Sequence, residues 1–318
     1  MAGKRRAFIT GVTGQDGSYL TELLLEKGYE VHGFARRGSR VPERVQAHFG
    51  DLLDPALLHR ALVETEPNEI YNLGAQSHVG ASFTEPHYSM RTTYEPLVTI
   101  LEWAASQRHD PRVYQASSSE MFGDAPAPQN ENSPFRPRSP YAIAKVAAHQ
   151  LVNLYREAHG IFAVAGILMN HESPRRPPAF VTRKITQGVA KIFHGEERYL
   201  TLGNLKAKRD WGFAGDYVKA MWLMLQQDKP GDYVVASGST HTVQEFVVEA
   251  FRCASEITGK SLDWQEHLRT DPRFERPVEV PLLLGNATRA CTELGWTPEV
   301  NFSGLVRMMV EFDLESKR

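Results

Sequence analysis

Short apolar runs alternate along the chain with longer stretches in which apolar residues recur every three or four positions. The first pattern is typical of buried strands and the second of helices. Strands are predicted at residues 7–10, 28–34, 45–49, 69–74, 112–116 and 161–169, and helices after Gly17, at 55–66, at 88–106 and from Tyr141 onward. Their alternation predicts an α/β fold with a doubly wound parallel sheet, in which ligands bind beyond the carboxyl ends of the strands.

The pattern changes after Arg176. A helix at 180–193, a short strand at 199–202, a polar loop at 203–211, a helix at 217–226 and a strand at 232–236 are expected. We therefore predict a nucleotide-binding domain made of residues 1–170 and about 211–237. A smaller, mixed α/β substrate domain would comprise about 171–210 and 238–318.

Three glycines lie between the first strand and the first helix, where a dinucleotide-binding turn belongs. Gly11 permits the tight turn, Gly14 lets the backbone approach a pyrophosphate, and Gly17 lets the helix pack closely on the strand. The helix N-terminus would then face the phosphates. Candidate cofactor contacts in this turn are Gly11, Thr13, Gly14, Gln15, Asp16 and Gly17.

Further cofactor contacts are expected where the next strands end. The second strand ends in Arg36-Arg37 instead of an acidic residue, which favours NADP because guanidinium groups suit a 2′-phosphate. Solvated surface arginines are the alternative. The candidates at the following strand ends are Asp51, Leu52, Leu73, Ala75 and Ser77.

Four side chains between residues 114 and 145 carry the candidate chemistry. Tyr141 and Lys145 are four residues apart and share one helix face, so the ammonium group is expected to lower the pKa of the phenol. Tyr141 could then take the proton of a sugar hydroxyl while hydride leaves the same carbon, with Ser118 bonded to that oxygen. Glu120 could remove the acidic proton beside the new ketone and then help water to leave.

Composition restricts the alternatives. The chain has 318 residues, 42% of them hydrophobic, and a formal net charge of −2, which is ordinary for an enzyme and gives no general attraction to nucleic acid or membrane. We expect a cytoplasmic protein with no membrane segment and no metal site. Cys253 and Cys291 are expected to be reduced thiols, with a disulfide as the minor alternative.

Taken together, these motifs resemble those of the GDP-mannose 4,6-dehydratase family, NADP-dependent members of the extended short-chain dehydrogenases/reductases. The resemblance rests on GVTGQDGSYL, the arginine pair, NLGAQSHVGAS, YQASSSEMFG, SPYAIAK, NHESPRR, FVTRKIT and LGNLKAKRDWGFAGDYV. It runs from about residue 7 to 235 and returns at RPVEVPLLLGN.

This resemblance implies residue roles. Ser118 would be the hydroxyl donor, Glu120 the base at C5 and Tyr141 the base at C4. The positions that match cofactor contacts are Tyr88, Lys145, His171 and Arg176. Those that match groups around a GDP-sugar are Asn170, Lys184, Arg209, Arg276 and Glu279.

The chain departs from the family pattern at three places. Ser118 replaces the usual threonine, and Pro177-Pro178 follows Arg176 where a glycine is usual. The segment between Arg37 and Asp51 is shorter than in many members. In the family the corresponding arginine loop reaches a neighbouring subunit's cofactor, so the resemblance implies a homotetramer formed as a dimer of dimers, and the shortening leaves a dimer as the alternative.

Other functions remain open from sequence alone. A GDP-manno-heptose 4,6-dehydratase would share every catalytic residue. A nucleotide-sugar 4-reductase or epimerase would leave Glu120 without a task, and a non-catalytic NADP sensor would not need Tyr141 and Lys145.

Overall fold

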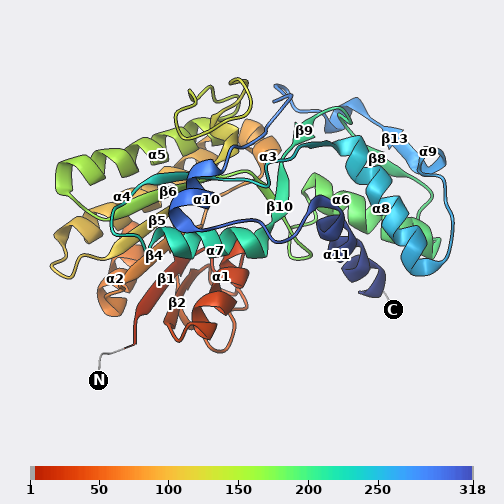
Figure 1. The fold of residues 1–318 in the computed structure, drawn as a ribbon. Coiled ribbons are helices and arrows are strands. Elements are labelled where there is room, and N and C mark those ends of the chain that lie inside the picture. Colours follow the sequence, from red (N-terminus) through yellow and green to blue (C-terminus); the bar gives the residue numbers. More distant parts are fainter. Residues whose placement is uncertain (1–3, 317–318) are drawn as a thin grey trace.

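The computed structural model describes residues 4–316 and consists of a larger part with a central sheet and a smaller, mostly helical part beside it (Figure 1). The sheet has seven strands in the order β11-β6-β5-β4-β1-β2-β3, and all neighbours are parallel. The strands are β1 (Arg6–Thr10), β2 (Glu30–Ala35), β3 (Gln46–Phe49), β4 (Glu69–Asn72), β5 (Arg112–Ser118), β6 (Ala163–Leu168) and β11 (Asp232–Val235). The predicted doubly wound α/β class is confirmed, and the strand order reverses at β1, where such sheets bind ligands.

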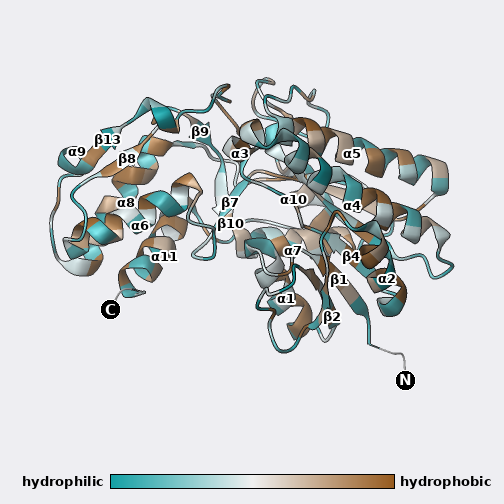
Figure 2. Cartoon of the chain, turned by 180° about the vertical axis from the view of Figure 1, so that it is seen from behind, coloured by the Kyte–Doolittle hydropathy of each residue, from teal (hydrophilic) through white to brown (hydrophobic). Residues whose placement is uncertain are grey.

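Helices cover both faces of this sheet. One face carries α1 (Gln15–Glu26) and α7 (Ala214–Met224), and the other carries α2 (Pro55–Thr65), α4 (Pro86–Ser106) and α5 (Pro140–His159). Separate apolar cores fill the two interfaces, with Leu24 and Met221 in the first and Leu101 and Val152 in the second. Figure 2 shows the corresponding concentration of hydrophobic residues on the strands. The central strands β1, β4 and β6 are buried along almost their whole length, as is typical of a parallel sheet covered on both faces.

The smaller part has a core of its own. Its elements are α6 (Val181–His194), β8 (Leu200–Leu202), α8 (Val243–Thr258), α9 (Trp264–His267), β13 (Leu268–Thr270), the 3₁₀ turn η2 (Pro272–Phe274) and α11 (Phe302–Glu315). Ile185, Phe246 and Met309 bring α6, α8 and α11 together in this core. Helix α8 starts at a capping box formed by Thr242 and Glu245, which satisfies backbone groups at the helix start.

Short elements join the two parts. Strands β7 (Asn170–Glu172) and β10 (Trp211–Phe213) pair in parallel, and β9 (Lys208–Arg209) pairs antiparallel with β12 (His241–Thr242). Helix α10 (Thr288–Leu294) packs on β11 and α7, so this stretch of the predicted 238–318 segment lies against the large sheet. The division of the chain into two domains remains a prediction. Residues 1–3 and 317–318, which the predicted domains include, lie outside the residues that the structure describes.

Element bounds differ from the predicted ones in a few places. The helix predicted at 88–106 begins at Pro86, and a separate short helix, α3 (Val79–Thr84), precedes it. The strand predicted at 161–169 is shorter, and β5 continues to Ser118 before the 3₁₀ turn η1 (Ser119–Met121). Cys253 and Cys291 are both free. Within residues 4–316 we find no helix with the length and apolar character needed to cross a membrane.

Candidate active site

A cavity of about 1220 Å³ lies beyond the carboxyl ends of the strands and is also lined by residues of the smaller part. It brings together the glycine turn, the ends of β2, β4 and β5, the start of α5, and residues 170–184, 202–211 and 273–279. Every predicted site residue except Arg37 lines this cavity; Arg37 is exposed next to Arg36, which does line it. One cavity therefore joins the candidate cofactor, catalytic and substrate residues.

The glycine turn is shaped for a ligand's close approach. Gly11 has φ +70°, a conformation that other residues rarely adopt. A Cβ atom at Gly17 would lie 2.3 Å from the carbonyl oxygen of Gly11, so any side chain there would displace the turn. The backbone at Gly14 and the N-terminus of α1 border the cavity, an arrangement that suits a pyrophosphate. These residues fit a dinucleotide cofactor.

Hydrogen bonds tie the glycine turn to β7. Nε2 of His171 lies 2.8 Å from Oδ2 of Asp16, and Nδ1 lies 2.8 Å from the carbonyl oxygen of Met169. The Gln15 amide donates to the His171 carbonyl oxygen at 3.1 Å and accepts from Oγ of Ser173 at 2.8 Å. These contacts connect the cofactor turn to the segment that leads into the smaller part.

The Asp16–His171 pair is held as an ion pair. Burial alone would lower the pKa of His171, but the Asp16 carboxylate and the hydrogen bond between them raise that pKa above its usual value. Burial would likewise raise the pKa of Asp16, but the imidazolium holds that pKa below its usual value. Because both ring nitrogens of His171 face oxygen acceptors, the charged ring satisfies both contacts.

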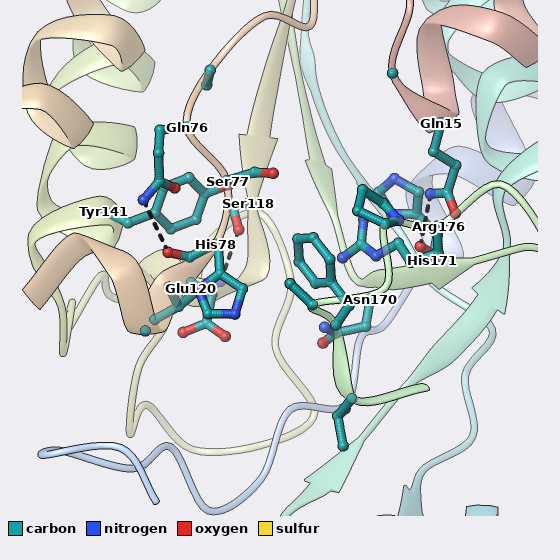
Figure 3. Close-up of a pocket in the computed structure, with 18 of the residues that line it drawn as sticks. Gln15, Gln76, Ser77, His78, Ser118, Glu120, Tyr141, Asn170, His171 and Arg176 are labelled. Carbon is teal, nitrogen blue, oxygen red and sulfur yellow. Dashed lines mark hydrogen bonds between the residues drawn. The ribbon is translucent and has the colours of Figure 1, made fainter. Parts of the chain in front are cut away.

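The four candidate catalytic residues lie on three elements, β5, η1 and α5. Ser118 ends β5, and its Oγ accepts a hydrogen bond from the backbone N–H of Glu120 at 3.2 Å, which shapes the turn that presents the Glu120 carboxylate. Tyr141 and Lys145 lie on the first turns of α5, which begins with Ser139 as its cap. Figure 3 shows Tyr141, Ser118 and Glu120 grouped on one side of the pocket, with His171 and Arg176 on the other.

The expected effect of Lys145 on Tyr141 is absent from this structure. Nζ of Lys145 donates to the carbonyl oxygen of Ala116 at 2.7 Å and lies 5.7 Å from the centre of the Tyr141 ring. Burial raises the pKa of Tyr141 to about 12, although a hydrogen bond with Ser118 opposes this shift. Burial also lowers the pKa of Lys145 to about 8. Lys145 is not among the groups that shift the pKa of Tyr141, so the prediction that it lowers the pKa of the phenol is wrong in this structure, where burial sets the direction.

Basic groups line the other half of the cavity. Arg209 is buried and donates to the carbonyl oxygens of Lys208 and Val280 and to Oε1 of Glu279, at 3.0, 2.7 and 2.9 Å. Burial lowers the pKa of Lys184, whose Nζ lies 3.4 Å from the centre of the Phe274 ring. Oδ1 of Asn170 is buried without a hydrogen-bond partner in the described chain, as expected for a group that awaits a ligand.

Sequence reasoning missed two polar residues of the loop after β4. Gln76 lines the cavity, and its Oε1 is buried without a partner among the described residues. His78 also lines it; its Nδ1 accepts from the backbone N–H of Ala81 at 3.0 Å, which leaves the proton on Nε2. Their signal was the polar run Gln76-Ser77-His78, which follows the buried strand β4 after three small or apolar residues and of which only Ser77 was predicted as a contact.

Comparisons of sequence and of structure identify relatives of this chain. Residues 8–309 match the family model described as GDP-mannose 4,6 dehydratase. The chain is 50% identical to GDP-mannose 4,6 dehydratase 1 of Arabidopsis thaliana, over 98% of this chain and 90% of the relative, and 45% identical to the human GDP-mannose 4,6 dehydratase, over 99% and 94%. Among solved structures, the UDP-glucose 4-epimerase of Thermus thermophilus in complex with NAD superposes with a TM-score of 0.84 at 26% identity, covering 97% of this chain and 98% of that one.

Proposed function

The chain belongs to the GDP-mannose 4,6-dehydratase family, and we propose on that premise that it removes water from GDP-mannose to give GDP-4-dehydro-6-deoxymannose. It is thus a lyase that uses a nicotinamide cofactor. The observation that supports this most strongly is the placement of Glu120 in one cavity with Ser118 and Tyr141. Of these side chains, oxidation of an alcohol needs only Ser118 and Tyr141, whereas loss of water next to a ketone needs a further base.

The reaction balances without net oxidation. A nicotinamide cofactor held at the glycine turn would supply the redox chemistry, that is, removal of hydride from C4 and its delivery to C6. Tyr141 takes the proton of the C4 hydroxyl, and Ser118 holds that oxygen. Glu120 removes the proton from C5 and gives it to the C6 hydroxyl, which leaves as water. C5 takes up a proton when C6 is reduced, and Tyr141 gives up the proton that it took from the C4 hydroxyl, so no proton is gained or lost overall. The products are the 4-keto-6-deoxy sugar nucleotide and one water molecule.

We propose NADP as the cofactor. The support is Arg36, which follows β2 and lines the cavity where a dinucleotide's ribose would lie, with no acidic residue at that strand end. Gly11, Gly14 and Gly17 would hold the pyrophosphate, Asp51 and Leu52 would lie near the adenine, and Lys145 would contact the nicotinamide ribose. Thr13, Gln15, Leu73, Ala75, Ser77, Tyr88, His171 and Arg176 complete the proposed cofactor contacts.

We propose that the GDP part of the substrate lies along the smaller part of the molecule. The support is the basic side of the cavity, where guanidinium groups suit a diphosphate. Asn170, Lys184, Arg209, Arg276 and Glu279 are the proposed contacts. We further propose a cytoplasmic homotetramer, which light scattering with NADP present tests; a species no larger than a dimer contradicts it.

Proton NMR of GDP-mannose incubated with the enzyme and a trace of NADP⁺ tests the function. The expected result is a new C6 methyl doublet without accumulation of NADPH. Net NADPH formation without a methyl signal would indicate a simple dehydrogenase instead. Reaction of GDP-manno-heptose but not of GDP-mannose would keep the mechanism and replace the substrate.

A further inference from the structure

Four charged side chains form a chain of alternating sign where the two parts of the molecule meet. Nη1 of Arg276 lies 3.2 Å from Oε1 of Glu120, the proposed base, and 4.0 Å from Oε1 of Glu279. The same Glu279 oxygen lies 2.9 Å from Nη2 of Arg209. Glu120 comes from the turn after β5, and Arg276 from the segment after η2, so their contact bridges the two parts.

The guanidinium groups of Arg209 and Arg276 differ in how many contacts fix them. Arg209 is 6% exposed and fixed by two backbone carbonyl oxygens in addition to Glu279. The Arg276 side chain is 31% exposed, and its ion pairs within residues 4–316 are with the carboxylates of Glu120 and Glu279. A guanidinium group held only by side-chain carboxylates on its exposed side can change partners at lower cost than one fixed to the backbone. Arg276 is therefore the exchangeable cation of this group.

Charge balance favours an exchange when a diphosphate arrives next to this group. Arg209 and Arg276 already neutralise Glu120 and Glu279, so no cation of this group is left over for a ligand. A diphosphate next to four such groups would meet two carboxylates as well as two guanidinium groups. Its attraction to Arg276 is realised only when Arg276 turns from a carboxylate to a phosphate oxygen, with which it can form the bidentate contact that guanidinium favours.

The exchange also bears on catalysis. The Oε1 atom of Glu120 accepts from Arg276, so the carboxylate has to turn or release Arg276 before this oxygen can approach a C–H bond of the substrate. Glu120 is 6% exposed, so water cannot easily replace the lost partner. The contact with Arg276 therefore holds the carboxylate that the proposed dehydration needs as its base.

We propose that Arg276 moves from Glu120 to the substrate's diphosphate, so that Glu120 becomes available as a base only when a nucleotide diphosphate is in the cavity. Arg276 is thereby a positioning residue for Glu120 as well as a substrate contact. The inference rests on the proposed function, because it requires a GDP-linked substrate. It explains how cleavage of a C–H bond is coupled to recognition of a distant part of the same substrate.

Binding of GDP alone to the NADP-loaded enzyme, measured by titration calorimetry, tests the exchange without catalysis. Glu120→Gln keeps the shape of the side chain but releases Arg276, so the substitution is expected to tighten GDP binding about tenfold, the size of one charged hydrogen bond. In an Arg276→Met background the same substitution is expected to change the dissociation constant less than twofold. Glu275→Gln is the matched control, since Glu275 is an exposed, cavity-lining carboxylate beside Arg276 in sequence; it should change GDP binding less than twofold.

Equal tightening by Glu120→Gln in both backgrounds, or none in either, overturns the exchange. A structure with GDP and cofactor decides the same point without substitutions, since Arg276 is expected on a phosphate oxygen and away from Glu120, and an intact pair contradicts this. If the parent enzyme binds no GDP, the proposed function and this inference fail together. If the binding cycle behaves as expected but GDP-mannose is not converted, only the proposed function fails.

Discussion

Replacing Asp16 by Asn isolates the charge of the Asp16–His171 pair. The amide keeps nearly the shape of the carboxylate, and it can turn its NH₂ group toward an unprotonated Nε2 of His171. The pair is mostly buried, with side-chain exposures of 21% for Asp16 and 11% for His171. Its loss should therefore cost more than an exposed ion pair and less than a fully buried one, about 1–3 kcal/mol in unfolding free energy near pH 6.

The sign of the pH dependence follows from the direction of the pKa shift. In the parent protein, Asp16 raises the pKa of His171 above 6.5, so this histidine's stabilising contribution is complete below about pH 6.5 and is lost as pH rises through the raised value. The lowered pKa of Asp16 matters only in acid, where its contribution is lost below about pH 4. In Asp16→Asn the raising effect of the carboxylate is gone, and burial lowers the pKa of His171. His171 should then be neutral at pH 7, and its protonation in acid should destabilise the folded protein.

Urea unfolding between pH 5.5 and 9 measures this difference. The parent protein should exceed Asp16→Asn in unfolding free energy most at pH 5.5 to 6, and the gap should shrink as pH rises toward 9. Asp228→Asn, a substitution of an exposed aspartate, serves as the control and should show a small gap at every pH. A gap for Asp16→Asn that stays constant from pH 6 to 9 would refute the ion pair.

Three further substitutions test other parts of the site. Glu120→Gln should lower formation of the C6 methyl group by at least about 100-fold while enzyme-bound NADPH still forms on mixing with GDP-mannose; normal methyl formation would remove Glu120 from the C5 step. Arg36→Ala should weaken NADP binding about 10- to 100-fold and leave NAD binding nearly unchanged, as measured by fluorescence titration, whereas equal losses for both cofactors would refute contact with a 2′-phosphate. Gly17→Ala, whose Cβ would lie 2.3 Å from the Gly11 oxygen, should abolish NADP binding in the same titration, and unchanged affinity would show that the turn relaxes.

Local sequence patterns predicted the sheet and much of the cavity. The turn at Gly11 and Gly17 depends on residues within one strand–helix unit, and the shared helix face of Tyr141 and Lys145 follows from their spacing alone. The alternation of short apolar runs with helical patterns is also visible in sequence, which is why the doubly wound parallel sheet could be predicted.

Contacts between distant segments could not be predicted. Asp16 pairs with His171 across 155 residues, and Glu120 pairs with Arg276 across 156. The hydrophobic periodicity of a sequence does not indicate which distant segments lie together. Strands of two or three residues, such as β7 and β9, are too short to show a hydrophobic pattern. The pKa of Tyr141 was misjudged for a related reason: its direction depends on burial, which sequence spacing with Lys145 does not reveal.

The central claim is that one cofactor molecule moves hydride from C4 to C6 of the same sugar while Glu120 exchanges the C5 proton with water. GDP-mannose labelled with deuterium at C4, incubated with enzyme and a trace of NADP⁺, tests it by NMR and mass spectrometry. The account predicts a CH₂D group at C6 in ordinary water and, with unlabelled substrate in heavy water, deuterium at C5. A CH₃ group from the labelled substrate, or a C5 position that takes no solvent deuterium, would contradict it.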